Sequence, residues 1–106
     1  MTFEEAISPH NADPFDRVYA WCYDMMYPYH NSKTAHVLLV DISDPGCFIS
    51  FGIEPAATVQ QFEDYIQGVP WTAQQLPAWT NLADWFVGSA EDLIRQVNQR
   101  SQQHDV

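Results

Sequence analysis

The chain has 106 residues, of which 46% are hydrophobic and 14% aromatic, and it carries a formal net charge of -10. A disordered acidic segment would be poor in aromatic side chains, so we expect the chain to fold. The strong negative field disfavours binding to nucleic acid or to an anionic membrane, and it attracts basic protein partners. Solubility alone is a second explanation for the same composition.

The length predicts one domain over residues 1–106, with 1–12 and 98–106 loosely ordered. A chain of this size can bury a core without metal or disulfide. No apolar run is long enough to span a membrane, and the acidic N-terminus lacks the apolar stretch of a secretory signal, so a cytoplasmic location is expected. Cys22 and Cys47 are expected to be buried free thiols, with a disulfide between them as the alternative.

The first strong signal for an element begins at Asp13 and Pro14, which suit the N-cap and first position of a helix. The apolar residues that follow recur at helical spacing up to Tyr27, and Pro28 ends the pattern. The residues of this stripe are Phe15, Val18, Tyr19, Cys22 and Met26. We therefore predict an amphipathic N-terminal helix over residues 14–27.

Two β-rich runs follow, residues 34–42 and 47–53, and a turn cluster that contains Pro45 and Gly46 separates them. This arrangement predicts a β-hairpin. The first run is apolar on both faces from Val37 to Val40, so both of its faces must be covered. The second run alternates, with Cys47, Ile49, Phe51 and Ile53 on one face.

Three helices are predicted after the hairpin. Thr58 and Gln61 form a capping box for the first, Thr80 caps a short second helix that Gly88 ends, and Ser89 begins the last. Their inward-facing residues are Val59, Phe62 and Ile66; Leu82, Trp85 and Phe86; and Leu93, Ile94 and Val97. The fold class is therefore α+β: a small antiparallel sheet built on a central β-hairpin, one N-terminal helix and about three C-terminal helices.

No motif in the sequence indicates an enzyme, a metal site or a cofactor site. The four histidines lack the spacing of a helical metal site, and an acidic surrounding disfavours a reactive Cys47 thiolate. Asp41, Ser43 and Asp44 form an acidic loop, but an EF-hand counted from Asp41 would need Glu where Gly52 stands. A turn held by the side chain of Asp44 fits this loop better than calcium.

A surface for binding a partner is the best candidate site. Aromatic rings interleaved with carboxylates are typical of binding hot spots, and both kinds of residue fall on the flanks of the predicted first helix. Further carboxylates fall on the polar sides of the C-terminal helices. The predicted partner-binding residues are Asp16, Trp21, Tyr23, Asp24, Tyr27, Glu63, Asp64 and Asp84. The alternative for the rings is packing against the sheet.

The leading hypothesis is a small acidic inhibitor, of the immunity-protein or antitoxin kind, that occupies a basic nuclease or nucleic-acid-binding surface of another protein. It implies a basic protein partner, no direct contact with nucleic acid and no membrane. The two-sided apolar run from Val37 to Val40 favours an alternative, a subunit of a larger complex or a homodimer. A calcium-binding domain and a small enzyme with a pocket lined by Trp71, Trp79 and Trp85 are further alternatives.

Overall fold

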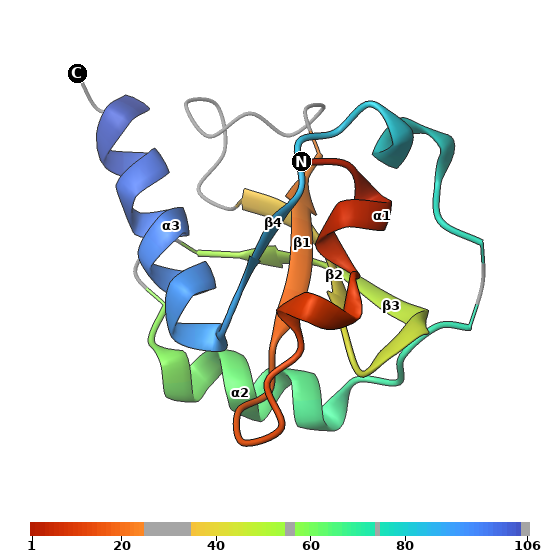
Figure 1. Ribbon diagram of the computed structural model, residues 1–106. Coiled ribbons are helices and arrows are strands. Elements are labelled where there is room, and N and C mark those ends of the chain that lie inside the picture. Colours follow the sequence, from red (N-terminus) through yellow and green to blue (C-terminus); the bar gives the residue numbers. More distant parts are fainter. Residues whose placement is uncertain (25–34, 55–56, 74, 105–106) are drawn as a thin grey trace.

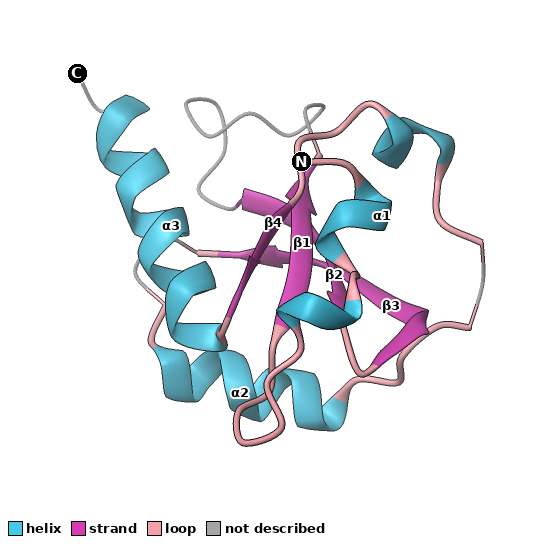
Figure 2. Cartoon of the chain, viewed as in Figure 1, coloured by secondary structure: helices cyan, strands magenta, loops and turns pink. Residues whose placement is uncertain are grey.

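The computed structural model describes residues 1–24, 35–54, 57–73 and 75–104. Its elements are shown in Figure 1 and, by type, in Figure 2. In chain order they are α1 (Phe3–Ala6), the 3-10 helix η1 (Pro9–Asn11), β1 (Tyr19–Tyr23), β2 (Ala35–Asp41), β3 (Asp44–Ile53), α2 (Val59–Gly68), the 3-10 helix η3 (Ala78–Asn81), β4 (Phe86–Gly88) and α3 (Ala90–His104). The strands form one antiparallel sheet in the order β3-β2-β1-β4. The α+β class and the central hairpin are therefore confirmed.

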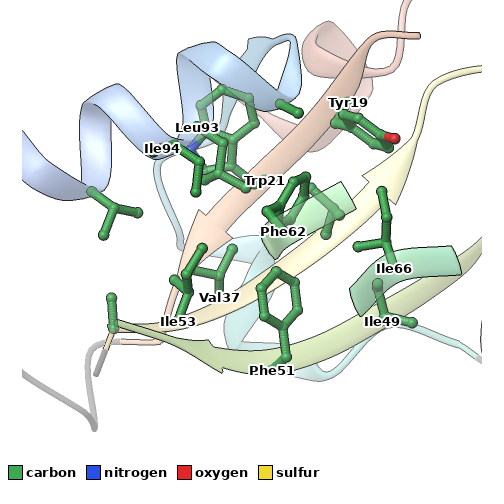
Figure 3. Packing of buried hydrophobic residues seen from close by; sticks show 14 of the residues in the cluster. Tyr19, Trp21, Val37, Ile49, Phe51, Ile53, Phe62, Ile66, Leu93 and Ile94 are labelled. Carbon is green, nitrogen blue, oxygen red and sulfur yellow. The ribbon is translucent and has the colours of Figure 1, made fainter. Parts of the chain in front are cut away.

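The sheet is covered on both faces, which makes three layers. On one face, β-strand residues pack against α2 and α3 (Figure 3). On the other face, the strands pack against α1 and the segment that leads into β4. The buried apolar residues of the central strand β2 divide accordingly: Ala35, Val37 and Leu39 join the first cluster, and Leu38 and Val40 join the second. The prediction that both faces of β2 must be covered is thus confirmed.

The β2–β3 hairpin is tighter than the sequence predicts. Only Ile42 and Ser43 connect the strands, and β3 already begins at Asp44, so Pro45 and Gly46 lie in a strand rather than in the turn. The predicted side-chain bond of Asp44 is made by Asp41 instead, whose Oδ1 accepts from the Ser43 backbone N–H at 2.9 Å. Proline is tolerated here because β3 is an edge strand.

The predicted first helix is wrong. Residues 14–16 form bends, and Tyr19–Tyr23 is the strand β1, buried at every position between β2 and β4. Phe15, which the helical stripe placed inward, is 92% exposed. A run that is apolar at every position is compatible with a helical stripe and with a central strand. Its aromatic residues favour the strand when neighbouring strands can pair with it.

The predictions for α2 and α3 are confirmed. Thr58 and Gln61 exchange the two hydrogen bonds of the capping box at the start of α2. α3 follows Ser89, whose hydroxyl accepts from the Asp92 backbone N–H at 3.3 Å. It continues to His104.

The short helix predicted between Thr80 and Gly88 is wrong. Thr80 lies in η3, and Leu82, expected to face inward, is 94% exposed. Trp85 packs in the second cluster while Phe86 packs against the first, so consecutive residues face opposite sides of the sheet. That alternation belongs to a strand, β4, which pairs with β1.

The first twelve residues form α1 and η1 and belong to the packed body of the structure. Ala6 is buried, and the rings of Phe3 and Trp85 lie 4.9 Å apart. The Met1 amino group donates to Asp84 Oδ1 at 2.7 Å, and the Met1 carbonyl accepts from the Trp85 backbone N–H. Within the part of the chain that is described, no helix is both long and apolar enough to cross a membrane.

Candidate functional site

An open cleft lies where the loop before β1 meets α2 and the start of α3. Its volume is about 500 Å³, within the range of ligand-binding sites. The residues that line it are Asp16, Arg17, Tyr19, Val59, Glu63, Ile66, Gln67, Ser89, Ala90 and Glu91. We call it the acidic cleft, because three of these residues carry carboxylates that come from three different segments.

The three carboxylates belong to Asp16 in the loop, Glu63 on α2 and Glu91 in the first turn of α3. Asp16 and Glu91 are exposed and Glu63 is half-buried. Glu91 contacts Arg95 on its own helix at 3.4 Å, but both side chains are largely exposed, so this pair is weak. The three carboxylates therefore keep much of their negative field for an incoming cation.

Arg17 is the only basic residue in the described lining of the acidic cleft, and its charge is paired with Asp41. Its Nε donates to Asp41 Oδ2 at 2.7 Å, and its guanidinium lies over the rings of Tyr19 and Trp71 at 5.4 and 5.8 Å. Burial opposes the charge on Arg17, but the hydrogen bond to Asp41 raises the pKa of the guanidinium overall. Asp41, which is 8% exposed, is in turn neutralised by Arg17.

The N-terminal end of α3 borders the acidic cleft and already holds its own carboxylate. Asp92 Oδ2 accepts from the Ser89 backbone N–H at 2.9 Å and from the Ser89 hydroxyl at 3.1 Å. The bond from the Ser89 backbone lowers the pKa of Asp92, which therefore stays ionised. This carboxylate balances the positive end of the helix dipole. The N-terminus of α3 is therefore already occupied and does not attract an anion into the cleft.

Of the seven predicted binding residues that the structure describes, two lie together in the acidic cleft, Asp16 and Glu63. Glu91 completes the acidic cleft, although from sequence its place in the first turn of the last helix is explained by helix stabilisation and requires no partner. Sequence spacing gives no signal that α3 begins beside α2, because that contact depends on β4 and on the path of the chain between the two helices. The predicted first-helix surface does not exist.

Trp21 and Tyr23 are core residues. They are 2% and 6% exposed and point from β1 toward α3. Trp21 Nε1 and the Tyr23 hydroxyl both donate to Gln96 Oε1, at 2.7 and 2.8 Å. The prediction that these rings are half-exposed is wrong, and the alternative, packing within the fold, is correct. Their aromatic character stabilises the layer between β1 and α3.

The other predicted binding residues are dispersed. Asp64 is exposed on α2 and accepts from Gln60, while Asp84 pairs with the N-terminal amino group. Asp24 follows β1 and is mostly buried beside His36. Tyr27 lies outside the described residues. These described positions therefore do not form one continuous acidic surface.

Asp24, His36 and Ser50 form a polar row across three neighbouring strand segments. The His36 ring lies 3.4 Å from the Asp24 carboxylate through Nδ1 and 3.3 Å from the Ser50 hydroxyl through Nε2. These residue types occur in hydrolase triads, but here they connect neighbouring strand segments. None of the three lines the acidic cleft. His36 thus links neighbouring strands as a cross-strand polar residue.

Metal binding finds no support among the residues that the structure describes, which contain no group of three or more His, Cys, Asp or Glu side chains placed to hold an ion. In the loop considered for calcium, the Asp41 carboxylate already accepts from Arg17 and from the Ser43 backbone. Cys22 and Cys47 are free, and burial raises the pKa of the Cys22 thiol to about 12. That thiol is therefore protonated at neutral pH and unreactive.

The tryptophan-lined pocket considered for a small enzyme is not formed. Trp71 packs against the first cluster, whereas Trp79 and Trp85 belong to the second cluster on the opposite face of the sheet. Comparison of the chain with protein-family models, with curated proteins and with solved structures finds no match. The acidic cleft is thus the feature on which a function can be argued.

Proposed function

We propose that the protein binds a basic protein partner through the acidic cleft, as a small inhibitor of the immunity-protein or antitoxin kind. One observation carries this proposal: Asp16, Glu63 and Glu91 converge on one open cleft, while Arg17, its one cation among the described residues, is held by Asp41. A Lys or Arg side chain of the partner would be attracted by these three carboxylates, because the charge of Arg17 is paired with Asp41. The target would be a surface that otherwise binds nucleic acid.

The net charge of -10 supports the same proposal at longer range. Charge of one sign steers a basic partner toward the molecule and raises the association rate. The net charge attracts the partner at long range, and the acidic cleft then supplies specific contacts at short range. A cytoplasmic location belongs to this proposal, and the free state of Cys22 and Cys47 suits a reducing compartment.

The alternative, an assembly subunit or a homodimer, is no longer supported by the apolar run on which it was based. Val37–Val40 suggests an unsatisfied apolar strand, but β2 lies in the middle of the sheet with apolar clusters on both faces. No enzyme function is proposed, because the polar row of Asp24, His36 and Ser50 lies outside the acidic cleft.

Neutralising the three cleft carboxylates tests the proposal. The immobilised wild type captures partners from a lysate of the native host at about 0.05 and 0.5 M salt, where screening is weak and strong. The captured protein is identified, and its affinity for the triple variant Asp16→Asn, Glu63→Gln, Glu91→Gln is measured. At about 0.5–1 kcal/mol per carboxylate, we expect roughly 10- to 150-fold weaker binding.

A matched control removes the same amount of charge elsewhere. Glu4, Asp44 and Asp64 are exposed and do not line the acidic cleft, so a variant with the corresponding amides should bind nearly as the wild type does. Circular dichroism and urea unfolding establish that both variants fold. A partner that is acidic, or one that binds both triple variants equally well, contradicts the proposal.

A further inference from the structure

The strand β3 lies at the edge of the sheet and pairs with β2 from Phe48 to Ile53 and again at Asp44, with an irregularity in between. On its outer side, the backbone N–H and carbonyl of Phe48 both bond to Thr72, at 3.0 and 2.8 Å. Phe48 therefore directs its backbone groups away from β2. Because these groups alternate in direction along a strand, those of Ser50 and Gly52 point outward as well.

The far side of β2 gives an independent check on this alternation. The carbonyl of His36, which stands opposite Gly52, accepts from the Asp24 backbone N–H and so faces away from β3. Among the described residues, none forms a hydrogen bond with the backbone N–H or carbonyl of Ser50 or Gly52. Both residues are exposed. The outer edge of β3 thus presents, at Ser50 and Gly52, backbone groups that another strand can pair with.

An apolar groove of about 230 Å³ runs beside this free edge, between β3 and α2. Phe51, Phe62 and Tyr65 form its aromatic wall: the ring of Phe51 lies 5.8 Å from that of Phe62 and 5.3 Å from that of Tyr65. Tyr65 is 46% exposed although it is large and largely apolar. Figure 3 shows Phe51 and Phe62 facing each other on this side of the sheet. Every second side chain of an added strand would lie over this groove.

We propose that an extended segment of a basic partner adds as a strand to the β3 edge at Ser50–Gly52, with alternate apolar side chains over the groove. The partner's basic side chains are favoured by Glu54, which lines the groove, and by the net charge of -10. That same charge opposes pairing of the edge with a second copy of the chain. The inference rests on the proposed function in one respect, the basic character of the partner.

Defined peptides test the proposal directly. The probe is a labelled peptide of about ten residues, the upper length of a usual strand, in which Lys and Val alternate. Its binding to the wild type is followed by fluorescence anisotropy. A second peptide of the same sequence carries N-methyl groups on the amides of one edge, so it keeps charge and apolar surface but loses the N–H donors. We expect N-methylation to weaken binding at least about tenfold.

Two variants of the protein, together with one control variant, test the same edge by changing the protein instead of the peptide. Ser50→Pro removes an outward N–H that bonds to no described residue, so the fold is expected to persist. Ser50→Ala is its matched control, because it also loses the hydroxyl but keeps the N–H. Tyr65→Ala removes part of the groove wall. We expect Ser50→Pro and Tyr65→Ala to bind the unmethylated peptide at least about tenfold more weakly, and Ser50→Ala to bind as the wild type does.

The outcomes separate this inference from the proposed function. Equal binding of both peptides, equal binding by Ser50→Pro and Ser50→Ala, or no binding to the wild type overturns strand addition. A peptide that loses affinity only for the triple variant of the acidic cleft binds there, which supports the proposed function and overturns the edge site. Sedimentation that finds a dimer of the wild type but not of Ser50→Pro assigns the edge to a second copy and overturns the proposal too.

Discussion

Gln96 joins the aromatic side chains of β1 to α3. Its Oε1 accepts from Trp21 Nε1 at 2.7 Å and from the Tyr23 hydroxyl at 2.8 Å, and Trp21 is buried. The indole N–H is only a donor, and when it is buried away from water it needs an acceptor within the fold. The amide oxygen of one half-buried glutamine thereby fixes how α3 sits on the sheet.

Replacing Gln96 with Leu should destabilise the protein. The change removes the acceptor of the Trp21 indole and leaves a buried donor unsatisfied, which costs about 1–3 kcal/mol in the free energy of unfolding. Urea unfolding measures the loss. Gln99→Leu, at an exposed position of the same helix, is the control and should change stability by less than about 0.5 kcal/mol. Equal effects of the two substitutions would show that the bond to Trp21 contributes nothing.

Sequence predicts some side-chain roles correctly and others not. The difference is how far apart in the sequence the interacting residues lie. The capping box of Thr58 and Gln61 is confirmed because all of its atoms lie within one helical turn. The role of Trp21 is not predictable in this way, because its partner Gln96 is distant in sequence. The same holds for Glu91, whose contribution to the acidic cleft depends on Asp16 and Glu63.

At the scale of single elements, two glycines at helix boundaries differ in the space that is available for a side chain. Gly68 ends α2, and a Cβ added there would have no atom within 4 Å. Gly88 ends β4, and a Cβ there would lie 2.6 Å from Asp92 Cβ and 2.7 Å from Asp92 Oδ2. Neither glycine has a positive φ, so the surrounding atoms decide the effect of a substitution.

The pair Gly68→Ala and Gly88→Ala should therefore shift stability in opposite directions. Alanine at Gly68 reduces the freedom of the unfolded chain and should stabilise by about 0.4–1 kcal/mol. Alanine at Gly88 displaces Asp92 from the bonds that it accepts from Ser89, and should destabilise by about 1–3 kcal/mol. Thermal and urea unfolding of both variants test this. Destabilisation by both, or by neither, would contradict the structure at the start of α3.

The elements differ in how clearly sequence predicts them. α2 and α3 each carry a cap and one apolar stripe, so their periodicity has a single interpretation. β1 is apolar at every position, which removes the contrast that distinguishes a period of 3.6 from a period of 2. β4 has only three residues, and it becomes a strand because β1 offers it an edge to pair with.

At the scale of the whole molecule, charge dominates. The net charge is -10, and within the described part of the chain Arg17 pairs with Asp41, and Arg95 with Glu91 and Asp92. The remaining carboxylates repel one another across a body with a radius of gyration of 13.2 Å. Unfolding separates these charges, so self-repulsion lowers the stability of the compact state.

Screening should therefore stabilise the fold. Raising NaCl from about 0.02 to 0.3 M shortens the Debye length to within the size of the molecule. We expect the free energy of unfolding to rise by on the order of 1 kcal/mol, comparable to one exposed charge pair at contact in water. Denaturant unfolding in NaCl and in KCl measures the effect, and agreement between the two salts excludes a specific ion. A fall in stability with salt would mean that the ion pairs outweigh the repulsion.

The sequence by itself determined the features that rest on local chemistry. These are the central hairpin, the capped helices α2 and α3, the need to cover both faces of β2, and an acidic surface. Only the tertiary structure decided that Tyr19–Tyr23 is a strand, that Trp21 and Tyr23 are core residues, and which carboxylates meet. The physical reason is that sheet pairing and burial join residues that are distant in the chain, and periodicity carries no information about such partners. The acidity predicted from composition therefore acquires a defined location only when α2, α3 and the loop before β1 converge at the acidic cleft.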